Sequence, residues 1–487
     1  MKKIADYKKL KLKVGLEIHQ QIDTKHKLFC NCSTGMNESE VKYEVLRKQH
    51  PVASELGDID IATQHEHMKN RSFTYQTFEN ETCIVDLDEE PPHNLNMEAL
   101  ETTIQVALLL NCDMPDEIQI MRKMITDGSN TSAFQRTMII GMNGWLKYGN
   151  KKIEIKQICL EEDAASKTEE DAKNVKYKLN RLGIPLMEIT TGIIEGYEPE
   201  QIQEIAFLIG IICRSTEKVK HGIGSVRQDV NVSIKNGERV EIKGVQELGL
   251  LSKVIEKEAE RQTGLKKVVK ETRSANPDGS TKFNRPLPGA ARMYPETDVL
   301  PIQMNKQWVN ELKENLPEAW TAKLNRFKKK MKLSDDLAIQ IIGSDYLKVF
   351  EKIIKKQSRI NATVVANVFT STLKDMRRSK LDTAALEERH FISMFEYYSK
   401  KKIVKEAFPE ILENFIKNSY ESISESVKKL NLTMLKKSEL NKIISNLVKD
   451  SPDTRKEKLY GIAMSRVRGR ADPKEVLEIV ENETKKR

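Results

Sequence analysis

The chain has 487 residues, of which 39% are hydrophobic and 31% charged, and its formal net charge is +9. This length predicts two to four domains, and this composition is typical of a globular protein rather than a disordered one. No apolar run reaches the eighteen or so residues of a membrane helix, so we expect no membrane partner. Six scattered cysteines and a charged start without an apolar signal core predict a cytoplasmic protein with reduced thiols.

The first predicted element is a strand over residues 12–21, LKVGLEIHQQ, in which apolar and polar residues alternate. Side chains two apart share one face of a strand, so Glu17 and His19 point the same way. A solvated edge strand explains this alternation as well as a functional site does.

Three cysteines follow in the next part of the chain. Cys30 and Cys32 stand in the motif CNC, and Cys83 could join them through folding. Zinc sites use such thiols, but no second CxxC completes a tetrahedral set nearby. Buried thiols without a metal are therefore the simpler interpretation, and zinc binding stays open.

Several later strands again carry charged residues between apolar neighbours. LEEDAAS ends one strand with three acids, NRLGIPLMEITTG contains a turn and then a strand, and GSVRQDVNVSI and VEIK alternate throughout. Each strand alone is more simply a solvated sheet face. Together, carboxylates beside imidazole, guanidinium and ammonium groups predict a floor for Mg²⁺ or Mn²⁺ and an anionic ligand. Neither GxxxxGK[ST] nor a GxGxxG after a strand is present, so an ATP site would be of another type.

The composition divides the chain into an α+β body and a helical remainder. Strand patterns dominate residues 1–305, whereas helical periodicity and abundant lysine mark residues 306–410 and a tail over 411–487. The tail contains the basic run SRVRGR with Arg466, Arg468 and Arg470. Such runs are usually solvated helix faces, but they also suit contact with nucleic-acid phosphates.

Eight motifs occur in one order along the chain: GLEIHQQIDTKHKLFC, TCIVDLDEEPP, RKMITDGSNTSAFQRT, EEDAAS, LNRLGIPLMEI, GSVRQDVNVSI, VEIKGVQEL and RPLPGAARMYPETD. In these motifs the chain resembles the GatB/GatE family of tRNA-dependent amidotransferase subunits. IHQQ, DGSNTSAFQRT, RQDVNVSI and ARMYPETD favour the archaeal E type over the bacterial B type. E-type chains usually carry an inserted domain similar to one in bacterial aspartyl-tRNA synthetases, and residues 252–279 leave no room for it here.

The resemblance implies a cradle domain of mixed or antiparallel sheet with helices, then an all-α domain and a YqeY-like tail that binds tRNA. It also implies an ATP-dependent carbon–nitrogen ligase with glutamine as the amido donor. In such enzymes ATP, with Mg²⁺, phosphorylates the glutamyl side chain of Glu-tRNA(Gln), and ammonia then displaces phosphate to give Gln-tRNA(Gln). The implied partner is a GatD-like, asparaginase-type protein that supplies the ammonia within a heterotetramer.

The resemblance also assigns roles by position. It implies catalysis and metal binding by Glu17, His19, Glu162 and Glu188. Residues expected to complete the catalytic floor are Arg227, Asp229 and Lys243, and residues expected to hold phosphates or position the glutamyl group are Asn180, Arg181, Asn231 and Ser233. For Arg227 and Lys243, structural ion pairing is an equally good expectation.

Three other functions remain open from the sequence. The chain could be a non-catalytic tRNA-binding subunit, or a B-type subunit that also accepts Asp-tRNA(Asn). A metal-dependent hydrolase or nuclease would also use carboxylates, a histidine and a basic tail, although it would not explain the ordered motifs.

Overall fold

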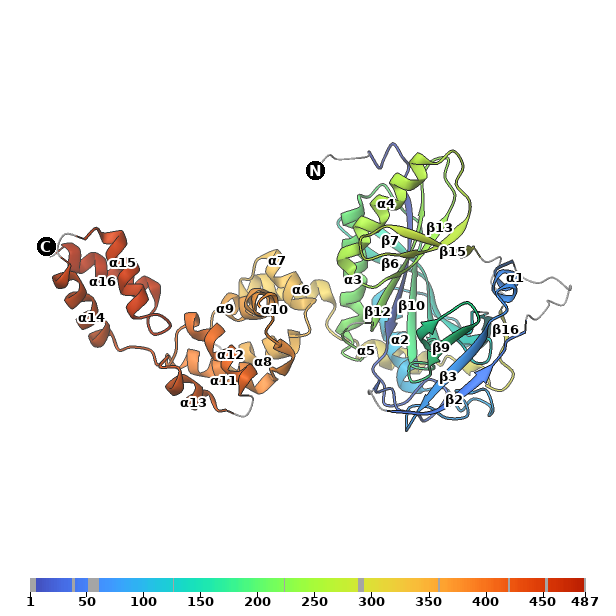
Figure 1. Cartoon of the computed structure of the whole chain (residues 1–487), viewed down its shortest axis with the longest axis horizontal. Coiled ribbons are helices and arrows are strands. Elements are labelled where there is room, and N and C mark those ends of the chain that lie inside the picture. Colours follow the sequence, from blue (N-terminus) through green and yellow to red (C-terminus); the bar gives the residue numbers. More distant parts are fainter. Residues whose placement is uncertain are drawn as a thin grey trace. The chain divides into compact units, whose positions relative to one another are not determined.

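Contacts in the computed structural model divide the chain into two compact units, residues 1–319 and residues 320–487 (Figure 1). The structure describes all residues except 1–5, 37–39, 51–60, 126, 223, 288–292, 358–359, 419–420, 452–453 and 486–487. No described helix is both long and apolar enough to cross a membrane.

An eleven-stranded mixed sheet forms the centre of the first unit as far as it is described. Its order is β15-β14-β13-β12-β1-β10-β7-β6-β5-β16, and β11 also pairs with β1. All pairs are antiparallel except β13 with β14. The strands are β1 (Lys13–Gln21), β5 (Met121–Met124), β6 (Phe134–Tyr148), β7 (Lys151–Glu162), β10 (Pro185–Thr191), β11 (Ile194–Glu195), β12 (Val226–Ser233), β13 (Val240–Val245), β14 (Glu271–Ala275), β15 (Thr281–Pro286) and β16 (Met293–Pro295).

Residue alternation gives this sheet one apolar face and one polar face. Leu16, Ile18 and Val230 are at most 1% exposed, and burying a side chain of this size contributes about 1.5–3 kcal/mol. Three helices pack on the sheet (Figure 1). Helix α2 (Met97–Leu109) contacts β6 and β7, α3 (Pro199–Ser215) contacts β1, and α4 (Leu251–Gly264) contacts β12. The polar side chains of the same strands consequently point to the opposite face.

A smaller sheet and several short elements complete the first unit. The sheet has the order β2-β3-β9-β8 (Val41–Arg47, Ser72–Phe78, Asn174–Lys178 and Ser166–Glu170) and its core includes Tyr75 and Tyr177. The short elements are α1 (Ile61–Met68), the pair β4 (Glu117–Ile118) and β17 (Ile302–Gln303), and the 3₁₀ turn Leu248–Leu250. Helix α5 (Lys306–Glu314) packs on α2 and so belongs to this unit. The sequence had predicted that residue 306 begins the helical domain.

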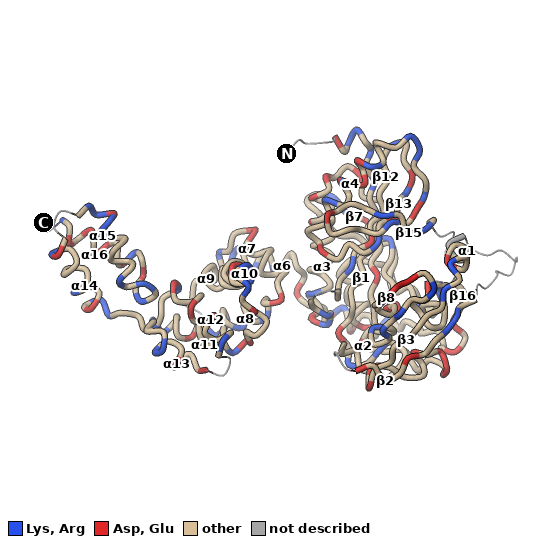
Figure 2. The backbone as a smooth tube through the Cα atoms, viewed as in Figure 1, with Lys and Arg blue, Asp and Glu red and all other residues tan. Residues whose placement is uncertain are grey.

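The second unit contains only helices among its described residues. They are α6 (Trp320–Met331), α7 (Asp335–Ile342), α8 (Leu347–Lys356), α9 (Ala362–Asn367), α10 (Leu373–Arg378), α11 (Glu388–Ser399), α12 (Phe408–Lys417), α13 (Ile423–Lys429), α14 (Lys437–Asp450), α15 (Lys456–Arg466) and α16 (Pro473–Lys485), with a π turn at Val368–Thr372 and 3₁₀ turns at Thr383–Ala385 and Lys405–Ala407. Basic and acidic residues are interspersed along them (Figure 2).

Two cores lie within this second unit. The rings of Tyr346, Phe369 and Phe391 pack against one another near the π turn. Helices α14, α15 and α16 bury a separate cluster around Leu459 and Val476. The predicted boundary between residues 410 and 411 falls inside α12, which packs on α11 and α13. The sheet body followed by helices confirms the predicted α+β class.

Candidate active site

The polar face of β1 meets the polar faces of both neighbouring strands. Glu17 lies opposite Asp229 of β12, and His19 lies opposite Glu188 of β10 and Arg227 of β12. Residues directly opposite each other on adjacent strands share a face and have neighbouring side chains. The structure therefore brings these polar residues together on the face that the packed helices leave open.

One group of potential ligands is formed by His19, Glu161 and Glu188, whose ligand atoms lie within 4.8 Å of one another. His19 Nε2 is 3.4 Å from Glu188 Oε2, and Lys123 Nζ lies 2.5 Å from Glu161 Oε1 and 3.7 Å from Glu188 Oε2. Among the described residues His19 Nδ1 is buried without a hydrogen-bond partner. Two carboxylates and an imidazole with an unsatisfied nitrogen are a donor set that suits a divalent cation.

Charge coupling stabilises the ionised forms in this group. Burial opposes ionisation at His19, but the hydrogen bond with Glu188 and the surrounding carboxylates raise the pKa of His19 above its usual value. Burial also opposes ionisation of Glu188, but the hydrogen bond with His19 and the charge of Lys123 hold the pKa of Glu188 well below its usual range. The ammonium group of Lys123 thus already partly neutralises the acidic pair.

A second group of ligands lies one strand further across the sheet. Glu17, Asp229 and Glu241 again have ligand atoms within 4.8 Å of one another. Lys243 Nζ contacts Asp229 Oδ2 at 3.0 Å and Glu241 Oε1 at 2.9 Å, and Asn231 Nδ2 donates a hydrogen bond of 3.0 Å to Glu17 Oε1. Burial, with a smaller contribution from the charge of Glu188, raises the pKa of Glu17 to about 6.

The backbone helps to hold this second group. The N–H of Gly244 donates a hydrogen bond of 3.0 Å to Asp229 Oδ1, at a point where the register between β12 and β13 shifts. Gly244 has φ of +79°, a left-handed conformation that glycine adopts without steric cost. The shift lets Lys243 and the Gly244 N–H reach the same carboxylate.

The expected position of Glu162 in the metal set needs a correction. Glu162 follows Glu161 along β7 and so points to the opposite face, where Glu162 Oε2 accepts a hydrogen bond of 3.0 Å from the backbone N–H of Arg136. Arg136 Nε also donates to Glu296 Oε2 at 2.7 Å. Glu161 takes the place expected for Glu162, because the register of β7 against β10 decides which of two adjacent acids faces His19.

The two predicted arginines make structural contacts rather than facing open space. Arg227 donates to Asp163 Oδ1 at 2.7 Å, and the buried Asp163 also accepts from Gln21 Nε2 at 2.6 Å. Arg181 donates to the carbonyl oxygens of Ala164 and Ala165 at 2.7 and 2.8 Å. These bonds hold the segment after β7, and the role of Arg181 in phosphate binding stays a prediction.

Asn180 and Ser233 are the other two expected phosphate ligands. Asn180 is buried in the turn after β9. Ser233 lies opposite Lys13 at the end of β12, four residues and so about 13 Å along the strand from Asp229. Sequence reasoning missed Lys123 and placed Glu161 and Glu241 on polar strand patterns without a role of their own, since their signal is only the alternation of polar residues within their strands.

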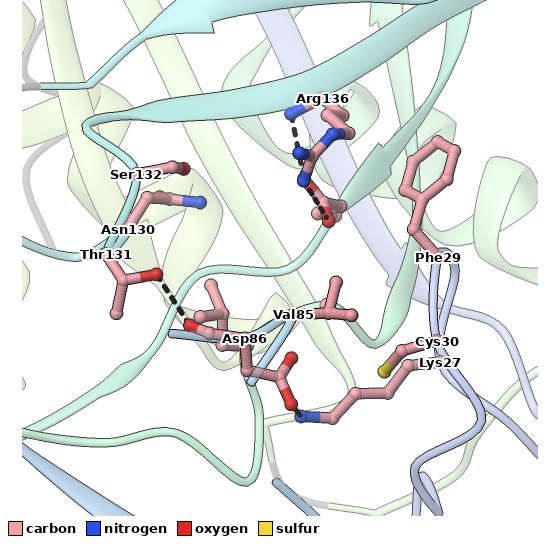
Figure 3. A pocket seen from close by; sticks show the side chains of 12 residues that line it. Lys27, Phe29, Cys30, Val85, Asp86, Asn130, Thr131, Ser132 and Arg136 are labelled. Atoms are coloured by element: carbon pink, nitrogen blue, oxygen red, sulfur yellow. Dashed lines mark hydrogen bonds and ion pairs between the residues drawn. The ribbon is translucent and has the colours of Figure 1, made fainter. Parts of the chain in front are cut away.

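A third group of ligands lies apart from these residues. Atoms of Cys30, Cys32, Cys83 and Asp86 lie within 4.8 Å of one another, and hydrogen bonds from the other two thiols lower the pKa of the Cys83 thiol. Asp86 also contacts the buried Lys27 at 3.1 Å (Figure 3). Folding thus brings Cys83 next to the CNC motif, and Asp86 supplies a fourth donor that the cysteine spacing did not reveal.

Comparison with known proteins identifies the family of the chain. The family model described as the GatB/GatE catalytic domain matches residues 12–310, and one described as the GatB domain matches residues 348–483. Relatives described as the E subunit of glutamyl-tRNA(Gln) amidotransferase include those of Methanococcus maripaludis (35% identical over 96% of this chain and 97% of the relative), Methanocaldococcus jannaschii (35%, 99% and 99%) and Saccharolobus solfataricus (32%, 99% and 99%).

These alignments extend over 616 to 632 residues, more than the 487 of this chain. The relatives therefore contain a long stretch that this chain lacks, as expected for a shorter, E-type sequence without the usual insert. Here α4 leads into β14 through residues 265–270 alone. Family models that cover most of the chain, and relatives aligned along nearly all of it, show that the chain belongs to the GatB/GatE family.

Proposed function

We propose that this chain is the tRNA-modifying subunit of a glutamyl-tRNA(Gln) amidotransferase. It uses ATP to phosphorylate the glutamyl side chain of Glu-tRNA(Gln), and ammonia then displaces the phosphate to give Gln-tRNA(Gln). The observation that carries the proposal is the pair of acidic groups on one open sheet face, each contacted by a lysine. Phosphoryl transfer needs such a site, because metal ions and cationic side chains must neutralise the charge of the transferred group.

The residues present fit Mg²⁺ in the group of His19, Glu161 and Glu188. The carboxylate oxygens of Glu161 and Glu188 suit this ion, and the buried, unpartnered His19 Nδ1 marks a place where a polar contact is missing. When bound, Mg²⁺ would supply positive charge for the transferred phosphoryl group. Glu17, Asp229 and Glu241 form a second place for a cation beside it.

The remaining steps are performed by the chain's own side chains. Lys243, held between Asp229 and Glu241, is placed to neutralise phosphate charge. Asn231 orients Glu17 through its hydrogen bond. When ammonia attacks the activated carbonyl carbon, a C–N bond forms, phosphate leaves with the C–O bonding pair, and the nitrogen loses a proton, which the carboxylate of Glu17 accepts.

The ammonia comes from a partner in this proposal. The sequence contains nothing similar to the Ser-Ser-Lys site of amidases or the threonine site of asparaginases, which favours an asparaginase-type, GatD-like protein as the donor. The relatives are themselves described as subunits, which supports a complex of several chains. The helical second unit, with exposed Arg466 and Arg468, would contact the tRNA backbone.

The test uses the purified full-length chain with ATP, Mg²⁺, ammonium chloride and Glu-tRNA(Gln). We expect Gln-tRNA(Gln) to form, and we expect Glu17→Ala, His19→Ala and Glu161→Gln each to lower its rate at least about 100-fold, since each removes a group that acts on the reacting atoms. Glu162→Gln is the matched control, since this acid lies on the opposite face. Its rate should stay within about tenfold of the natural chain.

Each other function predicts a different result. Phosphate release without Glu-tRNA(Gln) would indicate a hydrolase. Binding of tRNA without phosphate release, even after addition of a GatD-like protein, would indicate a non-catalytic tRNA-binding subunit. Amidation of Asp-tRNA(Asn) at a comparable rate would indicate B-type specificity.

A further inference from the structure

The polar face of the sheet extends beyond the second acidic group toward the edge strand β15. One row of paired residues runs from Asn231 through Glu241 and Thr272 to Arg285. Thr272 Oγ1 donates a hydrogen bond of 3.0 Å to Glu241 Oε2, which confirms that these side chains share a face. Arg285 therefore lies two strands beyond Glu241, about 10 Å away between backbones.

A second row ends in another cation of β15. Lys243 is paired with Ser274, and Ser274 is paired with Lys282, so Lys282 shares the face of Lys243 and lies the same two strands away. Phe283 points the other way, since it is paired with Arg273, and the register shift at Asn284 is what returns Arg285 to the face of Lys282. Arg273 donates to Thr281 Oγ1, which in turn donates to Glu258 of α4. Lys282 and Arg285 thus lie on the face opposite α4, and α1 also packs on β15.

These two outer cations differ from those further in. Lys123, Lys243 and Arg227 each contact at least one carboxylate. Within the part of the chain that the structure describes, neither Lys282 nor Arg285 forms an ion pair or a side-chain hydrogen bond, and Arg285 Nε is a buried donor without a partner. Leaving a buried charged donor unsatisfied is costly, so an anion at this place would remove the cost.

We propose that Lys282 and Arg285 bind phosphate groups of a ligand that reaches the acidic groups, either the polyphosphate of a nucleotide or the backbone phosphates near the 3′ end of a tRNA. The inference rests on the proposed function and adds a phosphate-binding edge to its site. The sequence of charges across the sheet supports the proposal. Cations bound at the two acidic groups would hold the reacting phosphoryl group. Lys282 and Arg285, two strands further out, would hold the phosphates that follow it. Figure 2 shows Lys and Arg along this edge around β15.

Arginine suits this role, since its planar guanidinium binds phosphate oxygens through two parallel hydrogen bonds. Lys282 is exposed and Arg285 is half-buried. Arg285 is consequently expected to contribute the stronger contact and Lys282 the weaker one.

The experiment measures binding to the full-length chain and its variants Arg285→Ala, Arg285→Lys, Lys282→Ala and the double alanine variant. Lys267→Ala is the matched control, because Lys267 is an exposed lysine of the same region, in the connection before β14. Calorimetry with Mg²⁺ reports the affinity for inorganic triphosphate and for a non-hydrolysable ATP analogue. Filter binding at several salt concentrations reports the affinity for tRNA(Gln).

If the phosphates are those of the nucleotide, Arg285→Ala should weaken triphosphate and analogue binding about tenfold, with partial rescue by Arg285→Lys and no effect of Lys267→Ala. If they are those of the tRNA, nucleotide affinity should stay unchanged. The salt dependence of tRNA binding should then decrease by about one unit of log–log slope per cation removed. Either pattern supports the phosphate-binding edge.

The inference is overturned if the double alanine variant binds triphosphate, the ATP analogue and tRNA(Gln) within twofold of the natural chain. This result would leave the proposed function intact, provided that the natural chain still forms Gln-tRNA(Gln). A natural chain that binds nucleotide and tRNA through these residues but forms no product would overturn the proposed function alone. A natural chain that binds neither ligand would overturn both.

Discussion

Replacement of Lys123 by methionine tests whether the ammonium group and a divalent cation occupy the same acidic pair. Lys123 contacts both Glu161 and Glu188, and Glu161 is only 2% exposed. Methionine retains most of the side-chain volume but leaves Glu161 without its cation and Glu188 with His19 alone. Removing one partner of a buried ion pair costs about 3–5 kcal/mol, so we expect the variant to lose roughly 3 kcal/mol of stability in the absence of divalent cations.

A bound cation should restore what the ammonium group supplied. A ligand that binds only the folded state, present at 100 times its Kd, adds about 2.7 kcal/mol, which nearly offsets the expected loss. Thermal unfolding of the full-length natural chain and of the variant, measured in EDTA and at rising Mn²⁺ concentrations, reports this effect. The variant should be less stable than the natural chain in EDTA and should gain more stability from Mn²⁺.

A second lysine variant controls for the loss of any surface charge. Lys167 pairs with Glu170 at 2.5 Å, but both side chains are about half exposed, and exposed pairs contribute at most about 1 kcal/mol. Lys167→Met should therefore show little change in either condition. If Mn²⁺ stabilises Lys123→Met no more than the natural chain, the acidic pair does not bind the cation and our reasoning is wrong.

Three further predictions concern the rest of the molecule. Three thiols and the carboxylate of Asp86 supply four donors of types that bind zinc. Metal analysis should therefore find stoichiometric zinc in the natural chain and in His19→Ala, but none in Cys83→Ser. A zinc-free natural chain would contradict this prediction. Burial opposes ionisation of Glu296, but hydrogen bonds from two arginines and a backbone N–H lower the pKa of Glu296 to about 2. Its charge therefore stabilises the fold above the unfolded pKa, by up to about 3 kcal/mol, and this contribution is lost as the pH falls from about 4.5 to about 2. Urea unfolding should show Glu296→Gln to be less stable at pH 7, with the difference shrinking over that range, and a pH-independent difference would argue against it. Arg466 and Arg468 are both exposed, and the contact of Arg468 with Glu410 is long, at 3.9 Å, so it contributes little to stability. Arg466→Ala and Arg468→Ala should therefore weaken tRNA binding and lessen its salt dependence without altering thermal stability. An unchanged salt slope would exclude these phosphate contacts.

The alternation along the first strand was sufficient to predict one part of the candidate site. Because side chains two apart in a strand share a face, Glu17 and His19 had to point the same way wherever that strand lay. The ordered motifs likewise predicted the family and the α+β class, because motifs and strand or helix patterns can be recognised from local sequence alone. Both predictions are confirmed by the strand pairing and by the family comparisons.

The choice between neighbouring acids could not be made from sequence. Glu161 and Glu162 both end the same strand, and only the register of β7 against β10 turns Glu161 toward His19. Arg227 shares the predicted face, but Asp163 from a distant segment binds its guanidinium. A strand sequence determines which residues share a face, whereas strand order and register determine which charges meet across that face. Those pairings depend on contacts between residues far apart in the chain, so only the tertiary structure decided them.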